Sequence, residues 1–177
     1  MLGASPYKLI NEVGVNNDRK LTDKNLRALE GAYRKAPYYG DVFPLMERVL
    51  ESGKDDIASY IAESFRIIGE YLDIKTEFII SSDLEKDCEQ KGQDKVLSIC
   101  KLLGATEYYN AIGGQQLYSY SDFQKQGISL KFLQTQEIVY AQFQNEFQPN
   151  LSIIDVMMFN SVEQIQQMLQ KYTLVCE

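Results

Sequence analysis

The stretch DKVLSICKLLGATEYYNAI, residues 94–112, predicts a helix followed by a strand. Its first half repeats apolar residues at helical spacing, and Gly104 suits the end of that helix. EYYNAI, residues 107–112, then predicts a strand. The stretch therefore contains one complete helix-to-strand unit, and its neighbours decide the fold class.

Two further apolar runs flank this unit. TEFIIS, residues 76–81, is nearly continuous and is typical of a strand covered on both faces, and ISLKFL, residues 128–133, predicts a third strand. A short polar helix that carries Tyr118 and Phe123 joins the last two strands. Because strands and helices alternate with short connections, we expect an α/β fold with a layered, parallel or mostly parallel sheet and flanking helices.

The remainder of the chain is predicted to be mainly helical, within one domain that covers residues 1–177. KLINEVGV, residues 8–15, alternates and predicts a short strand, whereas apolar stripes predict helices at 22–35, 41–53 and 55–72 and a helical C-terminus whose last helix reaches Tyr172. The expected caps are Thr22, Asp41, the pair Asp55 and Asp56, Ser152 with Asp155, and Ser161 with Gln164. The acidic pair fits either a cap or a metal site.

The composition excludes several classes of protein. The chain has 177 residues and a net charge of −7, which argues against non-specific binding of DNA or RNA. No apolar run approaches the roughly 20 residues needed to cross a bilayer, so we expect no membrane insertion. The start MLGASPYKL lacks the apolar core of a signal peptide, which favours a cytoplasmic location.

The absence of histidine restricts the chemistry further. With no histidine among the 177 residues, the chain cannot contain a Ser-His-Asp or Cys-His arrangement or a histidine-ligated zinc. Cys88, Cys100 and Cys176 do not have the spacing of a metal site or a disulfide framework. A general base must therefore be Asp, Glu, Lys, Tyr or a thiolate. The sequence predicts no metal site and leaves the cofactor unknown.

Ligands of open parallel sheets bind beyond the carboxyl ends of the strands, and two segments fall at such ends. The candidate ligand-binding residues are Ser81, Ser82, Lys91 and Gln93 in the loop after the first strand, and Asn110, Gly113, Gly114 and Gln115 after the second. The glycines fit a close approach of the backbone to an anion, or a turn that needs positive φ. The loop at 81–95 fits a binding loop or a solvated connection.

Other side chains carry two interpretations each. Asp155 fits a helix cap or a catalytic carboxylate, and Cys88 lies between two lysines that can lower the pKa of a thiol. Several tyrosines fit either core packing or the lining of a sugar or ring pocket: Tyr108, Tyr109, Tyr118, Tyr120 and Tyr140.

Four long segments carry a resemblance to a known family. They are YRKAPYYGDVFPLMERVL (33–50), EYLDIKTEFIISSDLEK (70–86), KGQDKVLSICKLLGATEYYNAIGGQQLY (91–118) and FQPNLSIIDVMMFNS (147–161). In this order they resemble the WbqC-like family of bacterial proteins. Family members usually begin with some fifty or sixty further residues, so this chain is expected to lack the family's N-terminal segment, which favours self-association as a homo-oligomer.

The resemblance implies a role in the synthesis of O-antigen or another surface polysaccharide. It suggests a transferase that attaches glycine, another aminoacyl group or an acyl group to a sugar, with a nucleotide-sugar or an activated amino-acid or acyl donor as partner. Asp83, Asp94 or Asp155 would then act as the general base for the sugar amine. The alternative is a non-catalytic module that binds a sugar nucleotide or a partner enzyme of the same pathway.

Overall fold

The structure is a computed structural model that describes residues 2–144 and 146–176. The chain forms two compact units: Met1–Phe78 with Val139–Met168, and Ile79–Ile138 with Leu169–Glu177. Each unit contains its own buried hydrophobic cluster. The single domain that the sequence predicts over residues 1–177 stays a prediction.

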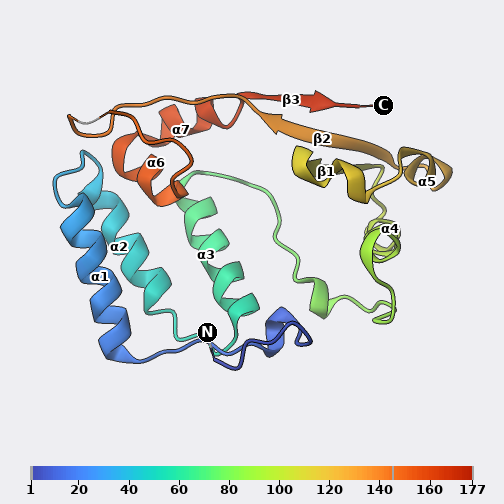
Figure 1. Ribbon diagram of the computed structural model, residues 1–177, viewed down its shortest axis with the longest axis horizontal. Helices are drawn as coiled ribbons and strands as arrows, with labels where there is room; N and C mark the ends of the chain where they lie inside the picture. The colour runs from blue at the N-terminus through green and yellow to red at the C-terminus, as the bar shows by residue number, and fades with distance from the viewer. Residues whose placement is uncertain (1, 145, 177) are drawn as a thin grey trace. The chain divides into compact units, whose positions relative to one another are not determined.

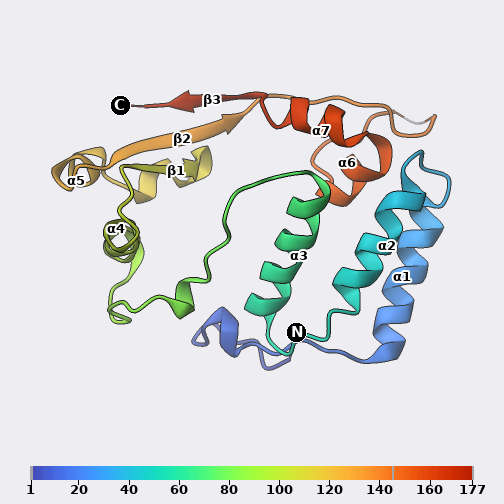
Figure 2. The same ribbon diagram turned by 180° about the vertical axis from the view of Figure 1, so that it is seen from behind.

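The first unit is helical. It contains the short 3-10 helix η1 (Ile10–Glu12) and the helices α1 (Arg19–Tyr33), α2 (Tyr39–Leu50), α3 (Ile57–Tyr71), α6 (Ile153–Phe159) and α7 (Val162–Met168). Figures 1 and 2 show α1, α2 and α3 side by side, and α2 also packs on α6. The core between these helices includes Val42, Met46, Ile67, Leu72, Met157, Met158 and Ile165.

Local polar residues set the starts of these helices. The Asp56 carboxylate accepts a hydrogen bond from the Ser59 N–H at 2.9 Å, which confirms that the acidic pair supplies a cap. The capping box of Ser161 and Gln164 is also confirmed, because each side chain accepts from the backbone N–H of the other residue. The cap predicted at Thr22 is wrong, since α1 begins at Arg19 and Asp18 caps it.

The second unit contains the sheet. Its elements are η2 (Ser81–Asp83), α4 (Gly92–Leu102), β1 (Glu107–Ala111), η3 (Ile112–Leu117), α5 (Tyr120–Lys125), β2 (Ser129–Thr135) and β3 (Tyr172–Val175). The strand order is β1-β2-β3, with β1 parallel and β3 antiparallel to β2. Side chains of α4 and α5 join the strand residues Leu130 and Phe132 in one core, so the predicted α/β class is confirmed.

Two of the predicted strands are wrong. Residues 8–15 contain η1 and single bridges at Gly14. Residues 76–80 have no regular secondary structure and Ser81 begins η2, so neither run forms a ladder among the described residues. The apolar run at 76–81 is partly covered by α3 instead, since Phe78 stacks on Phe65 with ring centroids 6.1 Å apart. An apolar run indicates burial, but a strand also needs a partner with free backbone groups.

The chain also ends differently from the prediction. The helices α6 and α7 lie in the predicted helical C-terminal part, but Tyr172 begins β3 rather than ending a helix. Thr135 and Phe132 of β2 pair with Tyr172 and Val175. Within residues 2–144 and 146–176, no helix has the length and apolar character required to cross a membrane.

Candidate functional site

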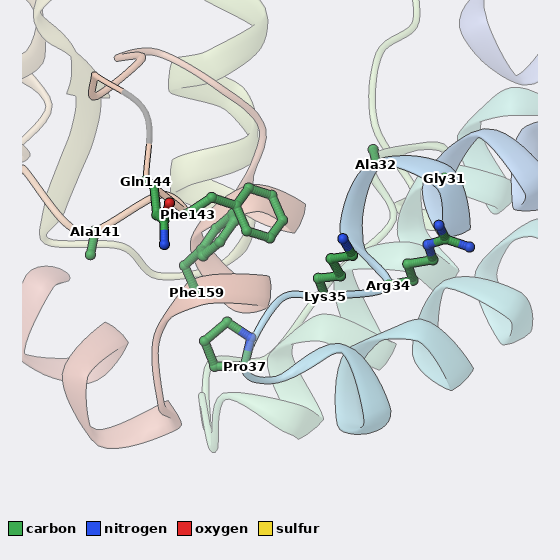
Figure 3. A pocket seen from close by; sticks show the side chains of 9 residues that line it. All are labelled: Gly31, Ala32, Arg34, Lys35, Pro37, Ala141, Phe143, Gln144 and Phe159. Atoms are coloured by element: carbon green, nitrogen blue, oxygen red, sulfur yellow. The ribbon is translucent and has the colours of Figure 1, made fainter.

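The first unit contains a surface hollow with a volume of about 800 Å³. We call it the α1 hollow; it is lined by Gly31, Ala32, Arg34, Lys35, Pro37, Ala141, Phe143, Gln144 and Phe159. Figure 3 shows the residues at the end of α1 on one side of it and the aromatic rings of Phe143 and Phe159 on the other. Its volume lies within the range of about 300–1,000 Å³ that small-molecule sites occupy.

One wall of the α1 hollow is cationic. Arg34 is the C-cap of α1 and Lys35 follows it, and both residues are exposed. Cations at this end of a helix are favoured because the last carbonyl groups carry partial negative charge. Within the part of the chain that the structure describes, neither side chain forms an ion pair. Both charges are therefore free to meet an anionic ligand.

The opposite wall is aromatic. Phe143 packs perpendicular to Phe159, with ring centroids 4.7 Å apart and an interplanar angle of 89°. Phe143 nevertheless remains 46% exposed, and its backbone has a φ of 47°. A left-handed conformation is strained for a residue with a bulky side chain, and such strain is concentrated at functional sites. The local backbone thus presents an exposed ring at the α1 hollow at an energetic cost.

A buried carboxylate ties the two walls together. Asp155 of α6 is only 3% exposed. Its Oδ1 accepts a hydrogen bond of 3.0 Å from Tyr33 Oη, and its Oδ2 accepts from Tyr140 Oη at 2.6 Å and from Gln142 Nε2 at 2.7 Å. Tyr33 precedes Arg34, and Gln142 precedes Phe143, so each wall is anchored to the same carboxylate.

The Gln142 side chain also bonds the backbone of Gln148, which lies beyond Phe143 and Gln144 in the sequence. Its Nε2 donates to the Gln148 carbonyl at 3.1 Å, and its Oε1 accepts from the Gln148 N–H at 2.7 Å. Both polar groups of the 8% exposed amide are therefore satisfied. This bracing holds the aromatic wall in place.

The tyrosines of this network are held in their neutral form. Burial, and after it the hydrogen bond to Asp155, raises the pKa of Tyr33 to about 12. The same two causes raise the pKa of Tyr140 to about 12, against a smaller opposing effect of Gln142. Both hydroxyl groups keep their protons and donate them to the oxygens of Asp155.

The geometry gives Asp155 a positioning role. Ser152 caps α6 by accepting from the Ile154 N–H, while the Asp155 carboxylate is occupied by Tyr33, Tyr140 and Gln142. The capping box predicted for Ser152 and Asp155 is therefore wrong. To accept a proton from a substrate, Asp155 would have to lose at least one of these hydrogen-bond donors. Breaking a hydrogen bond of a buried polar group is costly.

The other predicted site residues all lie in the second unit. Ser81, Ser82 and Asp83 form η2, Lys91 is the N-cap of α4, Gln93 and Asp94 occupy its first turn, and Asn110, Gly113, Gly114 and Gln115 lie in β1 and η3. Asp83 and Asp94 are exposed. Among the described residues, neither carboxylate takes part in an ion pair.

Hydrogen bonds give Gln93 a local structural role. Its Oε1 accepts from the Ser119 N–H at 2.6 Å, and its Nε2 donates to Asp122 at 3.1 Å, so Gln93 holds the start of α5. The adjacent Tyr118 lies with its hydroxyl group 3.5 Å from that of Tyr108. Tyr108 also packs on Phe123, so these two tyrosines belong to the core, as one of their two interpretations predicts.

Gly113 and Gly114, which follow β1, do not form the predicted turn. Neither Gly113 nor Gly114 has positive φ, so the interpretation as a positive-φ turn is wrong. A Cβ on Gly114 would lie 3.2 Å from Asn110 Nδ2, whereas a Cβ on Gly113 would have no neighbour within 4 Å. Gly114 therefore allows close packing against the Asn110 side chain.

Comparison with known families gives a direct match. The model of the WbqC-like protein family matches residues 2–167. This chain belongs to the WbqC-like family. No curated protein and no solved structure matches it.

Sequence reasoning on this WbqC-like protein identified Asp155 but missed the α1 hollow. Arg34, Lys35, Phe143 and Phe159 belong to no short motif, and Arg34 and Lys35 lie more than 100 positions from the other two in the sequence. One signal was present, since Arg34-Lys35 is a pair of adjacent cations in an acidic chain. Within residues 2–144 and 146–176, no group of three or more acidic or thiol side chains is arranged to hold a metal ion.

Proposed function

We propose that this WbqC-like protein binds a phosphorylated sugar, as the acceptor of a transfer reaction, in the α1 hollow and acts in the synthesis of a surface polysaccharide. The observation that supports the binding step is the free cationic pair Arg34 and Lys35 at the edge of an aromatic-walled hollow. Arginine and lysine are the usual partners of phosphate groups. The pathway follows from the family resemblance, and the cytoplasmic location that belongs to this proposal follows from the start MLGASPYKL, which lacks the apolar core of a signal peptide.

The reaction proposed for the bound sugar is transfer of an aminoacyl or acyl group. The amine of an amino sugar attacks the activated carbonyl carbon, the donor's leaving group departs with the electron pair of its bond, and the amine loses one proton to a base. Asp155 positions the hollow, and Asp83 and Asp94 lie in the second unit. No carboxylate is among the described residues that line the α1 hollow, so the base of this proposal is a group on the substrate.

The second candidate is a non-catalytic module that binds the same sugar. The observation that favours it is the full occupation of Asp155 by three hydrogen-bond donors. Self-association as a homo-oligomer remains compatible with both candidates.

Binding is tested by calorimetric titration with N-acetylglucosamine 1-phosphate and with its uridine diphosphate form, at low and moderate salt. We expect Arg34→Gln and Lys35→Gln each to weaken the affinity about three- to tenfold, because a charge-assisted hydrogen bond is lost. Arg27→Gln and Lys24→Gln remove the same charges from α1 outside the hollow and are the matched controls. Equal loss in all four variants, or no binding by the wild-type chain, would refute the proposal.

Transfer is tested separately by incubating the chain with a bound amino sugar and an activated glycyl or acyl donor. A transferase should form the amide product, and its formation at low sugar concentration should fall in Arg34→Gln and Lys35→Gln because these variants bind the sugar more weakly. Binding without product in the wild-type chain, under conditions that saturate both substrates, would favour the non-catalytic module.

A further inference from the structure

We infer that the α1 hollow is a site for a nucleoside diphosphate, in which the base stacks on Phe143 and the two phosphates meet Arg34 and Lys35. This inference rests on the proposed function and goes further, because it identifies the phosphate-bearing part of the ligand as a nucleoside diphosphate. It assigns a separate part of the ligand to each wall of the hollow.

The state of Phe143 is the first argument. The backbone of Phe143 has a φ of 47°, which is a strained conformation for an aromatic residue. Glycine or asparagine would adopt this conformation more easily. The residue is also 46% exposed, so its packing against Phe159 offsets only part of the strain. A ligand that stacks on the ring would supply the missing burial.

The neighbours of Phe143 pre-organise the ring. Its perpendicular contact with Phe159 fixes its orientation, and the side-chain amide of the preceding residue, Gln142, is hydrogen-bonded to the backbone of Gln148. Phe159 in turn packs against Tyr33, with ring centroids 6.2 Å apart and an interplanar angle of 66°. Since the ring is already held in place, little further ordering is needed when a flat ligand binds.

The distribution of charge is the second argument. The cations lie on the α1 side of the hollow and the rings lie on the side of residues 141–144, as Figure 3 shows. A molecule with a planar ring at one end and two phosphates at the other matches this separation. A sugar phosphate without a base would meet the cationic wall and leave Phe143 exposed.

The Gln144 side chain gives the site a means of contacting the edge of the base. It lines the hollow next to Phe143, and its amide offers both a donor and an acceptor. Such a contact selects among bases, whereas stacking tolerates every base because each has a π-face.

The test is calorimetric titration of the full chain with four probes: inorganic pyrophosphate, N-acetylglucosamine 1-phosphate, UDP and ADP. We expect at least one of the two nucleotides to bind about tenfold or more tightly than pyrophosphate. Phe143→Ala should weaken nucleotide binding about tenfold and change pyrophosphate binding less than about twofold, since base stacking is lost but the cations remain.

Two variants make the result specific to the ring. Phe143→Trp retains an aromatic face and should restore most of the nucleotide affinity. Phe65→Ala removes another exposed phenylalanine of the same unit, outside the hollow, and should leave nucleotide affinity unchanged. Unchanged pyrophosphate binding in Phe143→Ala also shows that the variant is folded.

The outcomes separate this inference from the proposed function. Nucleotides that bind no more tightly than pyrophosphate, or a Phe143→Ala variant with wild-type affinity for them, would overturn the inference while the cationic site stands. If none of the four probes binds, the proposed function fails, and the inference fails with it.

Discussion

Tyr140 Oη donates a hydrogen bond of 2.6 Å to Oδ2 of Asp155, the buried carboxylate to which Tyr33 and Gln142 also donate. This contact joins the segment before the aromatic wall to α6, while Tyr33 joins the end of α1 to the other oxygen of the same carboxylate. The geometry of the α1 hollow therefore depends on a side chain that does not line it.

Asp155→Asn should strongly destabilise the first unit. The amide keeps one acceptor oxygen but loses the charge, and its NH2 group faces either a tyrosine hydroxyl, which must turn from donor to acceptor, or Gln142 Nε2, with which it cannot pair. We expect a loss of about 2–4 kcal/mol in the free energy of unfolding, measured in urea. Asp94→Asn makes the same chemical change at an exposed carboxylate and should cost less than about 0.5 kcal/mol in the free energy of unfolding. Equal effects of the two changes would contradict the role of Asp155.

Gly114→Ala should be destabilising and Gly113→Ala should not. The new methyl group at position 114 would meet Asn110 at 3.2 Å, whereas position 113 has open space within 4 Å. Overpacking of this kind costs about 1–3 kcal/mol unless the neighbour moves. Removing the neighbour in a Gly114→Ala, Asn110→Ala double variant should recover part of the loss, which thermal melting of the four chains would show. A Gly113→Ala variant as unstable as Gly114→Ala would contradict this account.

Gln93→Ala should cost about 1–2 kcal/mol in unfolding free energy, because it removes the bonds to Ser119 and Asp122 at the start of α5. Gln115→Ala changes an exposed glutamine of η3 and serves as the control, with an expected effect below about 0.5 kcal/mol. Chemical denaturation measures both. If Gln93→Ala is neutral, the hydrogen bonds that it makes do not hold the second unit together.

Stability should fall at alkaline pH. The pKa values of Tyr33 and Tyr140 are raised from 10.0 to about 12 in the folded chain, so the folded state holds these two protons more tightly than the unfolded state. Their contribution to stability is present below about pH 10 and is lost as the pH rises toward 12.

The measurement is the midpoint of urea unfolding between pH 9 and pH 11.5, a window set by the raised pKa values. A Tyr33→Phe, Tyr140→Phe double variant lacks both titrating groups and should show a weaker dependence on pH over this window. The same slope in the double variant and the wild-type chain would contradict the assignment.

Some of the fold and of the site could be predicted from the sequence alone. The helix cap at Asp56, the capping box at Ser161 and the glycine that follows α4 are local features, because each depends on residues within one helical turn. The pair β1 and β2 was predictable from apolar runs on both sides of a short connection. Asp155 was recognisable as a carboxylate in an apolar helix, although its partners were not.

Only the tertiary structure decided the remaining features. Residues 76–81 have the composition of a strand, but Phe78 of this run packs on Phe65 of α3, while Tyr172–Val175 obtains a strand conformation by pairing with β2. The α1 hollow joins residues 31–37 with residues 141–159. The donors to Asp155 are likewise far apart in the sequence, since Tyr33 belongs to α1 whereas Tyr140 and Gln142 lie more than 100 positions later. Local sequence determines which backbone shapes and caps are favourable, whereas strand partners and binding walls depend on contacts between distant segments, which exist only after the chain has folded.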